Sequence, residues 1–230
     1  MTYQHLFFDL DRTLWDYDAN STRALTDIFH AYQLDQSFAS AEEFLGLYNH
    51  HNDLLWEDYR KGVIIKEDLR TKRFALTLRE KGINDQPLCM EIGVHYMNSM
   101  PRLNILAPNT IETLEYLKDR QYRMYILTNG FLSTQQQKMA HSRLDSYFIR
   151  IFSSEELGVN KPNAEIFHWA VSAVHGRKKE CLMIGDDFEV DIIGAKKYGI
   201  DTVWYNPAGL KSDPGPTYTI SNMSELQKIL

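Results

Sequence analysis

The chain of 230 residues contains little cysteine and no long apolar run. Two cysteines, Cys89 and Cys181, are too few for the disulfide framework of a small secreted domain, and their apolar neighbours predict buried packing residues. No apolar stretch approaches the about 18 residues that a membrane span needs, and no charged-then-apolar leader precedes the first strand-like segment. We therefore expect a cytoplasmic protein without a membrane partner.

Positively charged residues are fewer than negatively charged ones, because the chain has 25 Lys and Arg against 31 Asp and Glu. The formal net charge is -6. This balance disfavours attraction to a nucleic-acid polymer but allows a local cationic pocket for a small anion. Internal repeats and low-complexity segments are lacking too. The length and the 43% hydrophobic content suit one α/β domain, alone or with a smaller insert, in a monomer or a homodimer.

Short apolar segments alternate with helical patterns over most of the chain. The segment 6–8 is continuously apolar and is followed at once by Asp9, which predicts a buried strand ending at a polar edge. Further strands are expected at 123–128, 149–152, 181–184 and 202–205. The segment 206–216, with three prolines, predicts a loop before a closing strand and helix. This alternation predicts an α/β fold with a doubly wound parallel sheet built from right-handed βαβ units.

Residues 17–102 carry helical patterns without strand signals. Apolar side chains recur at helical spacing in two sets there, which are Leu25, Ile28, Phe29 and Tyr32, and Phe44, Tyr48, Leu55 and Tyr59. Two further helices are expected at 66–81 and 87–100. We therefore predict that 17–102 forms an inserted α-helical domain with its own small core, while 1–16 and 103–230 together form the α/β core.

Polar side chains gather just after the predicted strands and in one adjoining loop. They are, in chain order, Asp9, Asp11, Thr13, Thr128, Asn129, Lys161, Asp186 and Asp187. In an open parallel sheet the functional crevice lies beyond the carboxyl ends of the strands, so these side chains should converge. Carboxylates, hydroxyls and an ammonium together suit one divalent cation and one phosphoryl group.

Each of these groups alone has an ordinary explanation, as a turn, a helix cap or a solvated loop. Their joint occurrence in this order favours function. The pattern resembles the four motifs of the haloacid dehalogenase (HAD) superfamily over the whole chain. Asp9, Asp11 and Thr13 match the first motif, Thr128 matches the second and Lys161 the third. The fourth motif is matched by Gly185, Asp186, Asp187 and Asp191.

The helical insert resembles the cap domain of the HAD subgroup whose cap follows the first strand. Within that subgroup, segments 13–20 and 55–62 resemble the pyrimidine 5′-nucleotidases, which hydrolyse nucleoside monophosphates. The resemblance implies a phosphatase whose partner is a small phosphorylated metabolite, in particular a nucleoside monophosphate.

The resemblance also implies a role for each motif residue. Asp9 would be the nucleophile that forms an aspartyl-phosphate, and Asp11 would be the general acid and base. Mg²⁺ would bind the Asp9 and Asp186 carboxylates and the Asp11 main-chain carbonyl. Two further acids, Asp187 and Asp191, would orient the groups around the metal. The phosphoryl oxygens would be stabilised by Thr128, the Asn129 amide and Lys161.

Other activities on the same fold remain alternatives. A sugar-phosphate or phosphoglycolate phosphatase and a phosphomutase would retain all four motifs. A haloacid dehalogenase is opposed by Asp11 and Asp186, because that branch resembles enzymes without a second acid or a metal. Phosphonate cleavage would need a reactive lysine in the insert, among Lys61, Lys66 and Lys72. A non-catalytic binding protein is opposed by the complete acid set.

Two questions stay open at the level of sequence. Arg12 could pair with a carboxylate of the cap or lie beside the leaving group, and exposed arginines favour the first. The aromatic residues Trp15, Trp56, Tyr59 and Phe74 could stack on a nucleobase or form packing contacts.

Overall fold

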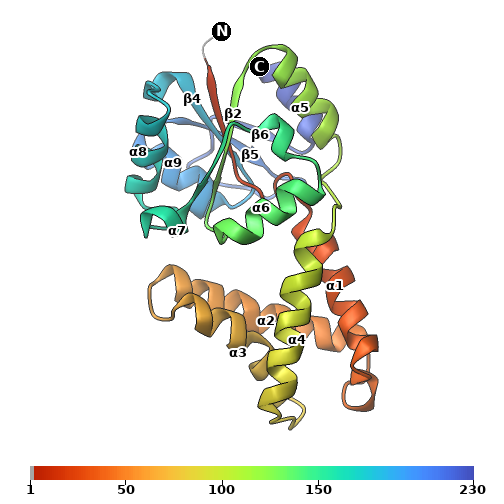
Figure 1. The fold of residues 1–230 in the computed structure, drawn as a ribbon. Helices are drawn as coiled ribbons and strands as arrows, with labels where there is room; N and C mark the ends of the chain where they lie inside the picture. The colour runs from red at the N-terminus through yellow and green to blue at the C-terminus, as the bar shows by residue number, and fades with distance from the viewer. Residues whose placement is uncertain (1–2) are drawn as a thin grey trace. The chain divides into compact units, whose positions relative to one another are not determined.

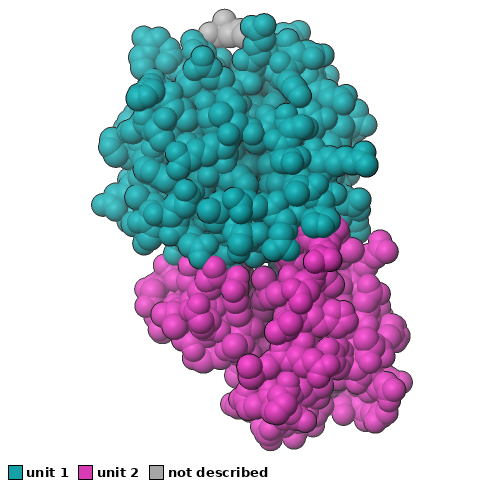
Figure 2. Space-filling model, in the orientation of Figure 1, with its two compact units in different colours: residues 1–17, 104–230 teal, residues 18–103 magenta. Residues whose placement is uncertain are grey.

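The computed structural model describes residues 3–230, and contacts divide the chain into two units (Figure 2). Unit 1 comprises Met1–Tyr17 and Asn104–Leu230, and unit 2 comprises Asp18–Leu103. Residues 1 and 2 of the predicted core segment 1–16 lie outside the described residues. In the described part of the chain, no helix combines the length and the apolar character needed to cross a membrane.

Unit 1 is built on a six-stranded sheet in which all neighbouring strands are parallel. Its strands are β1 (His5–Phe8), β2 (Arg123–Thr128), β3 (Arg150–Ser153), β4 (Cys181–Gly185), β5 (Asp201–Tyr205) and β6 (Tyr218–Ile220). The strand order is β3-β2-β1-β4-β5-β6, so β1 lies between β2 and β4. The predicted doubly wound parallel sheet is confirmed.

Helices cover both faces of this sheet (Figure 1). On one face Phe7 lies level with Tyr125 of β2 and Met183 of β4, and this row packs in a core shared with α8 (Ala164–Ala173) and α9 (Gly194–Tyr198). On the other side lie α5 (Thr110–Asp119) and α6 (Leu132–His141). Because both faces are buried, the strands read as continuous apolar runs.

The remaining elements of unit 1 are short. They are η3 (Asp145–Tyr147), α7 (Ser154–Leu157), η4 (Lys178–Glu180), η5 (Phe188–Ile193), η6 (Met223–Glu225) and α10 (Leu226–Ile229). The predicted closing strand and helix are therefore present as β6 and α10. The third strand begins at Arg150, one residue later than expected, and Ile149 is exposed.

Unit 2 consists of helices. They are α1 (Tyr17–Ala31), η1 (Leu34–Gln36), α2 (Ala41–Arg60), α3 (Lys66–Arg79), α4 (Gln86–Ser99) and η2 (Met100–Arg102). Side-chain caps start two of them, because Ser40 accepts from the backbone N–H of Glu43 and Asp85 accepts from that of Leu88.

The core of unit 2 is aromatic. The rings of Tyr48, Phe74 and Tyr96 lie 5.0 to 5.5 Å apart, centroid to centroid. Within this cluster the buried guanidinium of Arg73 contacts the Tyr48 hydroxyl at 3.2 Å and lies 5.0 Å from the Tyr96 ring centroid. Both predicted buried cysteines, Cys89 in unit 2 and Cys181 in unit 1, are buried.

Candidate active site

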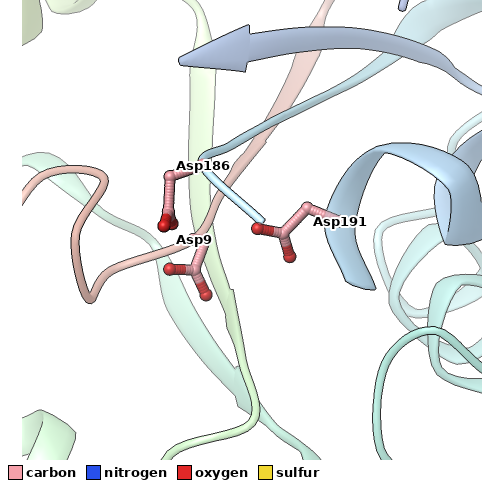
Figure 3. Close-up of side chains that lie close together, drawn as sticks. All are labelled: Asp9, Asp186 and Asp191. Atoms are coloured by element: carbon pink, nitrogen blue, oxygen red, sulfur yellow. The ribbon is translucent and has the colours of Figure 1, made fainter. Parts of the chain in front are cut away.

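Three aspartates meet at the carboxyl ends of β1 and β4 (Figure 3). The backbone N–H of Asp9 donates to the Ile184 carbonyl at 2.9 Å, which continues the pairing of the two strands and fixes Asp9 at the strand end. Asp186 follows β4 directly, and Asp191 lies on η5. One carboxylate oxygen from each of these three aspartates lies within 4.8 Å of the other two.

The ammonium group of Lys161 joins two of these carboxylates. Its Nζ donates to Asp9 Oδ1 at 2.7 Å, to Asp191 Oδ1 at 2.6 Å and to the Leu127 carbonyl at 2.7 Å. Lys161 is 1% exposed, so these contacts form out of water. All three ammonium hydrogens are used inside the protein, and Lys161 therefore holds the Asp9 carboxylate in a fixed orientation.

The side chain of Asn129 holds the loop that carries Lys161. Its Oδ1 accepts from the Lys161 backbone N–H at 2.8 Å, and its Nδ2 donates to the Lys161 carbonyl at 3.0 Å. Both ends of the side-chain amide are therefore engaged by one peptide segment. The second Nδ2 hydrogen and the main-chain N–H are the two groups of Asn129 that can donate to a phosphoryl oxygen.

The acid cluster carries unbalanced charge. When Asp9, Asp186 and Asp191 are ionised, three negative charges face the single positive charge of Lys161, which leaves two negative charges. Burial raises the pKa of Asp9 to about 7, although the positive charge of Lys161 acts to lower it. Burial and the negative charge of Asp9 together raise the pKa of Asp186 to about 7. Burial also raises the pKa of Asp191 to about 6. A divalent cation with oxygen ligands fits this donor set in both charge and chemistry.

Neighbouring groups hold the fourth-motif loop around these acids. The Thr13 hydroxyl donates to Asp186 Oδ1 at 2.9 Å. A Cβ atom on Gly185 would lie 2.3 Å from Asp191 Oδ2, so glycine is required for this close approach. The Asp187 carboxylate accepts from the backbone N–H groups of Glu189 and Val190 and caps η5. Asp187 thus lies at the helix start, outside the cluster of three acids.

Asp11 has different surroundings from Asp9. The chain turns sharply after it, because Arg12 has a left-handed backbone with φ of 63°. Asp11 Oδ2 accepts from Gln135 Nε2 at 2.9 Å, and its Oδ1 pairs with Lys138 Nζ at 2.5 Å. Gln135 and Lys138 were not predicted from the sequence. The available signal was two polar residues three positions apart on the helix that follows Thr128.

The Thr128 hydroxyl is also held. Its Oγ1 accepts from the Gly130 backbone N–H at 3.0 Å and from Gln135 Nε2 at 2.8 Å. Thr128 is the last residue of β2 and neighbours β1 in the sheet. The predicted phosphate-binding hydroxyl therefore lies at the same edge of the sheet as Asp9.

The structure revises part of the interpretation of the aromatic residues. Trp15 and Phe74 are fully buried, and the Lys138 ammonium lies 4.5 Å from the Trp15 ring centroid. This burial favours the packing alternative for these two residues. Trp56 and Tyr59 are half-buried and pack edge to face at 5.7 Å, which leaves base contact open for both.

Two predicted alternatives concern charged side chains. The Arg12 guanidinium lies 4.7 Å from the Tyr17 ring centroid within unit 1, and both proposed roles of Arg12 stay predictions. Lys61 pairs with Glu57 and Lys72 pairs with Asp68, all on the surface. These exposed ion pairs are typical of solvated helices and do not support the environment that activates a Schiff-base lysine.

Comparison with known proteins agrees with this site. A family model of haloacid dehalogenase-like hydrolases matches residues 3–199, and the chain belongs to this family. It is 32% identical to pyrimidine 5′-nucleotidase PynA of Streptococcus pneumoniae, over 98% of this chain and 94% of that protein. It is also 32% identical to pyrimidine 5′-nucleotidase YjjG of Escherichia coli, over 100% of this chain and 99% of that protein.

A solved structure extends the similarity to three dimensions. The crystal structure of the HAD-hydrolase YfnB from Bacillus subtilis bound to magnesium superimposes with a TM-score of 0.89 at 29% identity, covering 100% of this chain and 99% of that one. The predicted superfamily, the predicted fold and the prediction that the protein is an enzyme are therefore confirmed.

Proposed function

We propose that this protein is a magnesium-dependent phosphomonoester hydrolase that forms an aspartyl-phosphate on Asp9 and acts on nucleoside 5′-monophosphates. The observation that carries the proposal is the cluster of buried Asp9 and Asp191 with half-buried Asp186. Lys161 pairs with Asp9 and Asp191, and the Thr128 hydroxyl lies on the adjoining strand. Its residual negative charge calls for a cation, and its nucleophile lies at the carboxyl edge of the sheet.

In the first half-reaction, an Asp9 carboxylate oxygen forms a bond to phosphorus while the bond between phosphorus and the ester oxygen breaks. Lys161 holds Asp9 Oδ1, so Oδ2 is the oxygen that we assign to attack. Asp11 gives its proton to the departing oxygen, which leaves as an alcohol. The Thr128 hydroxyl donates to a phosphoryl oxygen as charge shifts in the transition state.

In the second half-reaction, water attacks the phosphorus of the phosphoaspartate and loses a proton to Asp11. The bond between phosphorus and Asp9 breaks, which restores the carboxylate and releases inorganic phosphate. Magnesium, held by the Asp9 and Asp186 carboxylates and the Asp11 main-chain carbonyl, would neutralise negative charge on the phosphoryl group. Asp191 acts through its ion pair with Lys161.

The choice of substrate is assigned to unit 2. Every phosphate monoester presents the same phosphoryl group, so discrimination between esters must come from groups that contact the remainder of the substrate. The similarity to two pyrimidine 5′-nucleotidases supports a pyrimidine nucleotide as that substrate. In unit 2, the half-buried Trp56 and Tyr59 offer aromatic surface for a base.

A substrate panel tests the proposal. Purified protein with Mg²⁺ is assayed for phosphate release from pyrimidine and purine nucleoside 5′-monophosphates, hexose phosphates and phosphoglycolate. The pyrimidine nucleotides should give the highest kcat/KM. A hexose phosphate with a kcat/KM tenfold above that of every nucleotide would overturn the nucleotidase assignment but not the phosphatase assignment. No phosphate release from any ester would overturn both.

A further inference from the structure

Two buried polar side chains on α6 contact the residues assigned to acid–base chemistry and phosphate binding. Gln135 is 0% exposed and Lys138 is 3% exposed, and they lie one helical turn apart on the same face. Neither belongs to the motifs that define the site. Both reach Asp11, and Gln135 also reaches Thr128.

The amide of Gln135 links two functional groups with one nitrogen. Its Nε2 carries two hydrogens, of which one is donated to Asp11 Oδ2 at 2.9 Å and the other to Thr128 Oγ1 at 2.8 Å. Thr128 Oγ1 accepts a second hydrogen bond from the Gly130 N–H. Both lone pairs of the hydroxyl oxygen are then occupied, so its own hydrogen is left to donate to a phosphoryl oxygen.

Lys138 holds the other oxygen of Asp11. Its Nζ lies 2.5 Å from Asp11 Oδ1 and 4.5 Å from the Trp15 ring centroid. An ammonium removed from water needs such a partner, and the pairing fixes the carboxylate in return. The two residues of α6 therefore bind one carboxylate oxygen each and leave Asp11 a single orientation.

The backbone near Thr128 is shaped to admit Gln135. A Cβ atom at Gly130 would lie 2.2 Å from Gln135 Nε2. A side chain at position 130 would displace the amide, so the glycine after Asn129 serves this contact.

Packing alone does not explain the position of Gln135. Among the described residues, its Oε1 is buried without a hydrogen-bond partner. An unpaired buried acceptor lowers stability, whereas an apolar side chain of similar size would avoid that loss. The amide is therefore retained at a cost in stability, in a position where both of its N–H groups contact the proposed machinery.

We propose that Gln135 and Lys138 are positioning residues, in which Gln135 aligns the Asp11 carboxylate and the Thr128 hydroxyl together and Lys138 aligns Asp11 alone. The inference rests on the proposed phosphatase function and assigns roles within that site. The two residues have different roles, because Gln135 affects both proton transfer and phosphate binding whereas Lys138 affects proton transfer alone.

The test compares Gln135→Met and Lys138→Met with Gln137→Met, an exposed glutamine on the same helix. Values of kcat/KM are measured for p-nitrophenyl phosphate, whose leaving group needs little protonation, and for butyl phosphate, whose leaving group needs it. Inhibition by inorganic phosphate reports on the Thr128 side. Circular dichroism and thermal unfolding report on the fold.

For Gln135→Met, kcat/KM for butyl phosphate should fall about 10- to 100-fold more than for p-nitrophenyl phosphate, and the inhibition constant of phosphate should rise about fivefold or more. Lys138→Met should show the same dependence on the leaving group with the phosphate constant unchanged, and Lys138→Arg should restore part of the loss. Gln137→Met should match the wild type.

The inference would be overturned by equal losses of kcat/KM for both esters, or by an unchanged inhibition constant of phosphate, in Gln135→Met. Turnover by the wild type would still support the proposed phosphatase function in that case. A wild type without turnover of either ester would overturn both. If Gln135→Met does not fold, Gln135→Asn and Gly130→Ala carry the test, because each moves the amide while keeping the surrounding polar groups. Wild-type behaviour in those two variants would also refute the positioning role.

Discussion

Both units bury cations, and two of these, Lys161 in unit 1 and Arg73 in unit 2, have different partners. In unit 1, the Lys161 ammonium lies within 2.7 Å of two carboxylates, Asp9 and Asp191. In unit 2, the Arg73 guanidinium contacts uncharged groups, which include the Tyr48 hydroxyl, the Asn52 side-chain oxygen and the face of the Tyr96 ring.

This difference in partners indicates that Lys161 serves the chemistry of the site and that Arg73 serves packing. A buried ammonium between carboxylates places charged groups where they can interact with a metal ion and a phosphoryl group. A guanidinium among hydroxyl, amide and ring groups fixes the positions of helices without creating a reactive centre. We therefore expect changes in unit 1 to affect turnover and changes in the core of unit 2 to affect stability.

The largest expected effect comes from Asp9→Asn in unit 1. The substitution removes the nucleophile at a strand end and leaves the packing of β1 intact, so turnover should fall on the order of 10⁴-fold or more. Phosphate release with Mg²⁺ measures turnover, and circular dichroism checks the fold. Activity near that of the wild type would contradict the assignment of Asp9.

The matched variants Lys161→Met and Arg73→Met test the comparison itself. Lys161→Met leaves two buried carboxylates without their ammonium and should lower the free energy of unfolding by about 3–5 kcal/mol at neutral pH while abolishing turnover. Arg73→Met leaves neutral polar groups unpaired and should cost about 1–3 kcal/mol.

Urea unfolding and p-nitrophenyl phosphate hydrolysis are measured for both variants. Turnover should survive in folded Arg73→Met, because Tyr48, Asn52 and Tyr96, which its guanidinium contacts, all belong to unit 2. Equal loss of turnover in the two variants would show that the two buried cations do not differ in role.

Metal binding should stabilise unit 1 by a smaller amount. Mg²⁺ at 100 times its dissociation constant should raise the free energy of unfolding by about 2.7 kcal/mol, and Asp186→Asn should remove this gain. EDTA should abolish turnover, and added Mg²⁺ should restore it. The same stabilisation in wild type and Asp186→Asn would place the metal elsewhere.

The stabilisation should also depend on pH. Burial raises the pKa of Asp9 and Asp186 to about 7, so the folded state keeps protons that the unfolded chain releases above about pH 4. Raising the pH from about 4 to 7 should therefore destabilise the metal-free protein, and the gain from Mg²⁺ should grow over the same interval. Thermal unfolding at pH 5 and pH 8, with Mg²⁺ and with EDTA, measures both trends.

The smallest expected effect concerns specificity and unit 2. Stacking on an aromatic side chain contributes about 1–3 kcal/mol, or roughly five- to 150-fold in kcat/KM. Trp56→Leu should lower kcat/KM for the best nucleotide by up to that factor and barely change p-nitrophenyl phosphate, with the helical signal unchanged. If both substrates lose equally, Trp56 is a packing residue.

The sequence predicted the sheet well because its strands are buried on both faces and read as short continuous apolar runs. The segment 123–128 is confirmed without change as β2, whereas β3 begins at Arg150 instead of 149. Strand ends are harder to predict because pairing with a neighbour decides them. Ile149 is apolar yet exposed, and it precedes Arg150, the first residue of β3 that pairs with β2.

Part of the site was predicted because its residues follow strands, whereas Lys161 and Asp191 were predicted from the motif pattern. Asp9, Thr128 and Asp186 each come directly at or after a strand end, so the order of the strands alone brings them to one edge. Gln135 and Lys138 were missed because a polar residue on a helix is normally solvated. Their burial depends on how α6 packs beside the turn that carries Asp11, which no local pattern encodes.

The sequence by itself determined which residue types follow each strand, and therefore that acids, a hydroxyl and an ammonium would share one edge of a parallel sheet. The tertiary structure decided what each of them contacts. It directed Lys161 to Asp9 and Asp191, Asp187 to the start of η5 and the Gln135 amide to Asp11. The physical reason is that periodicity fixes faces and strand ends, whereas the partner of a buried charge depends on distances between segments far apart in the chain.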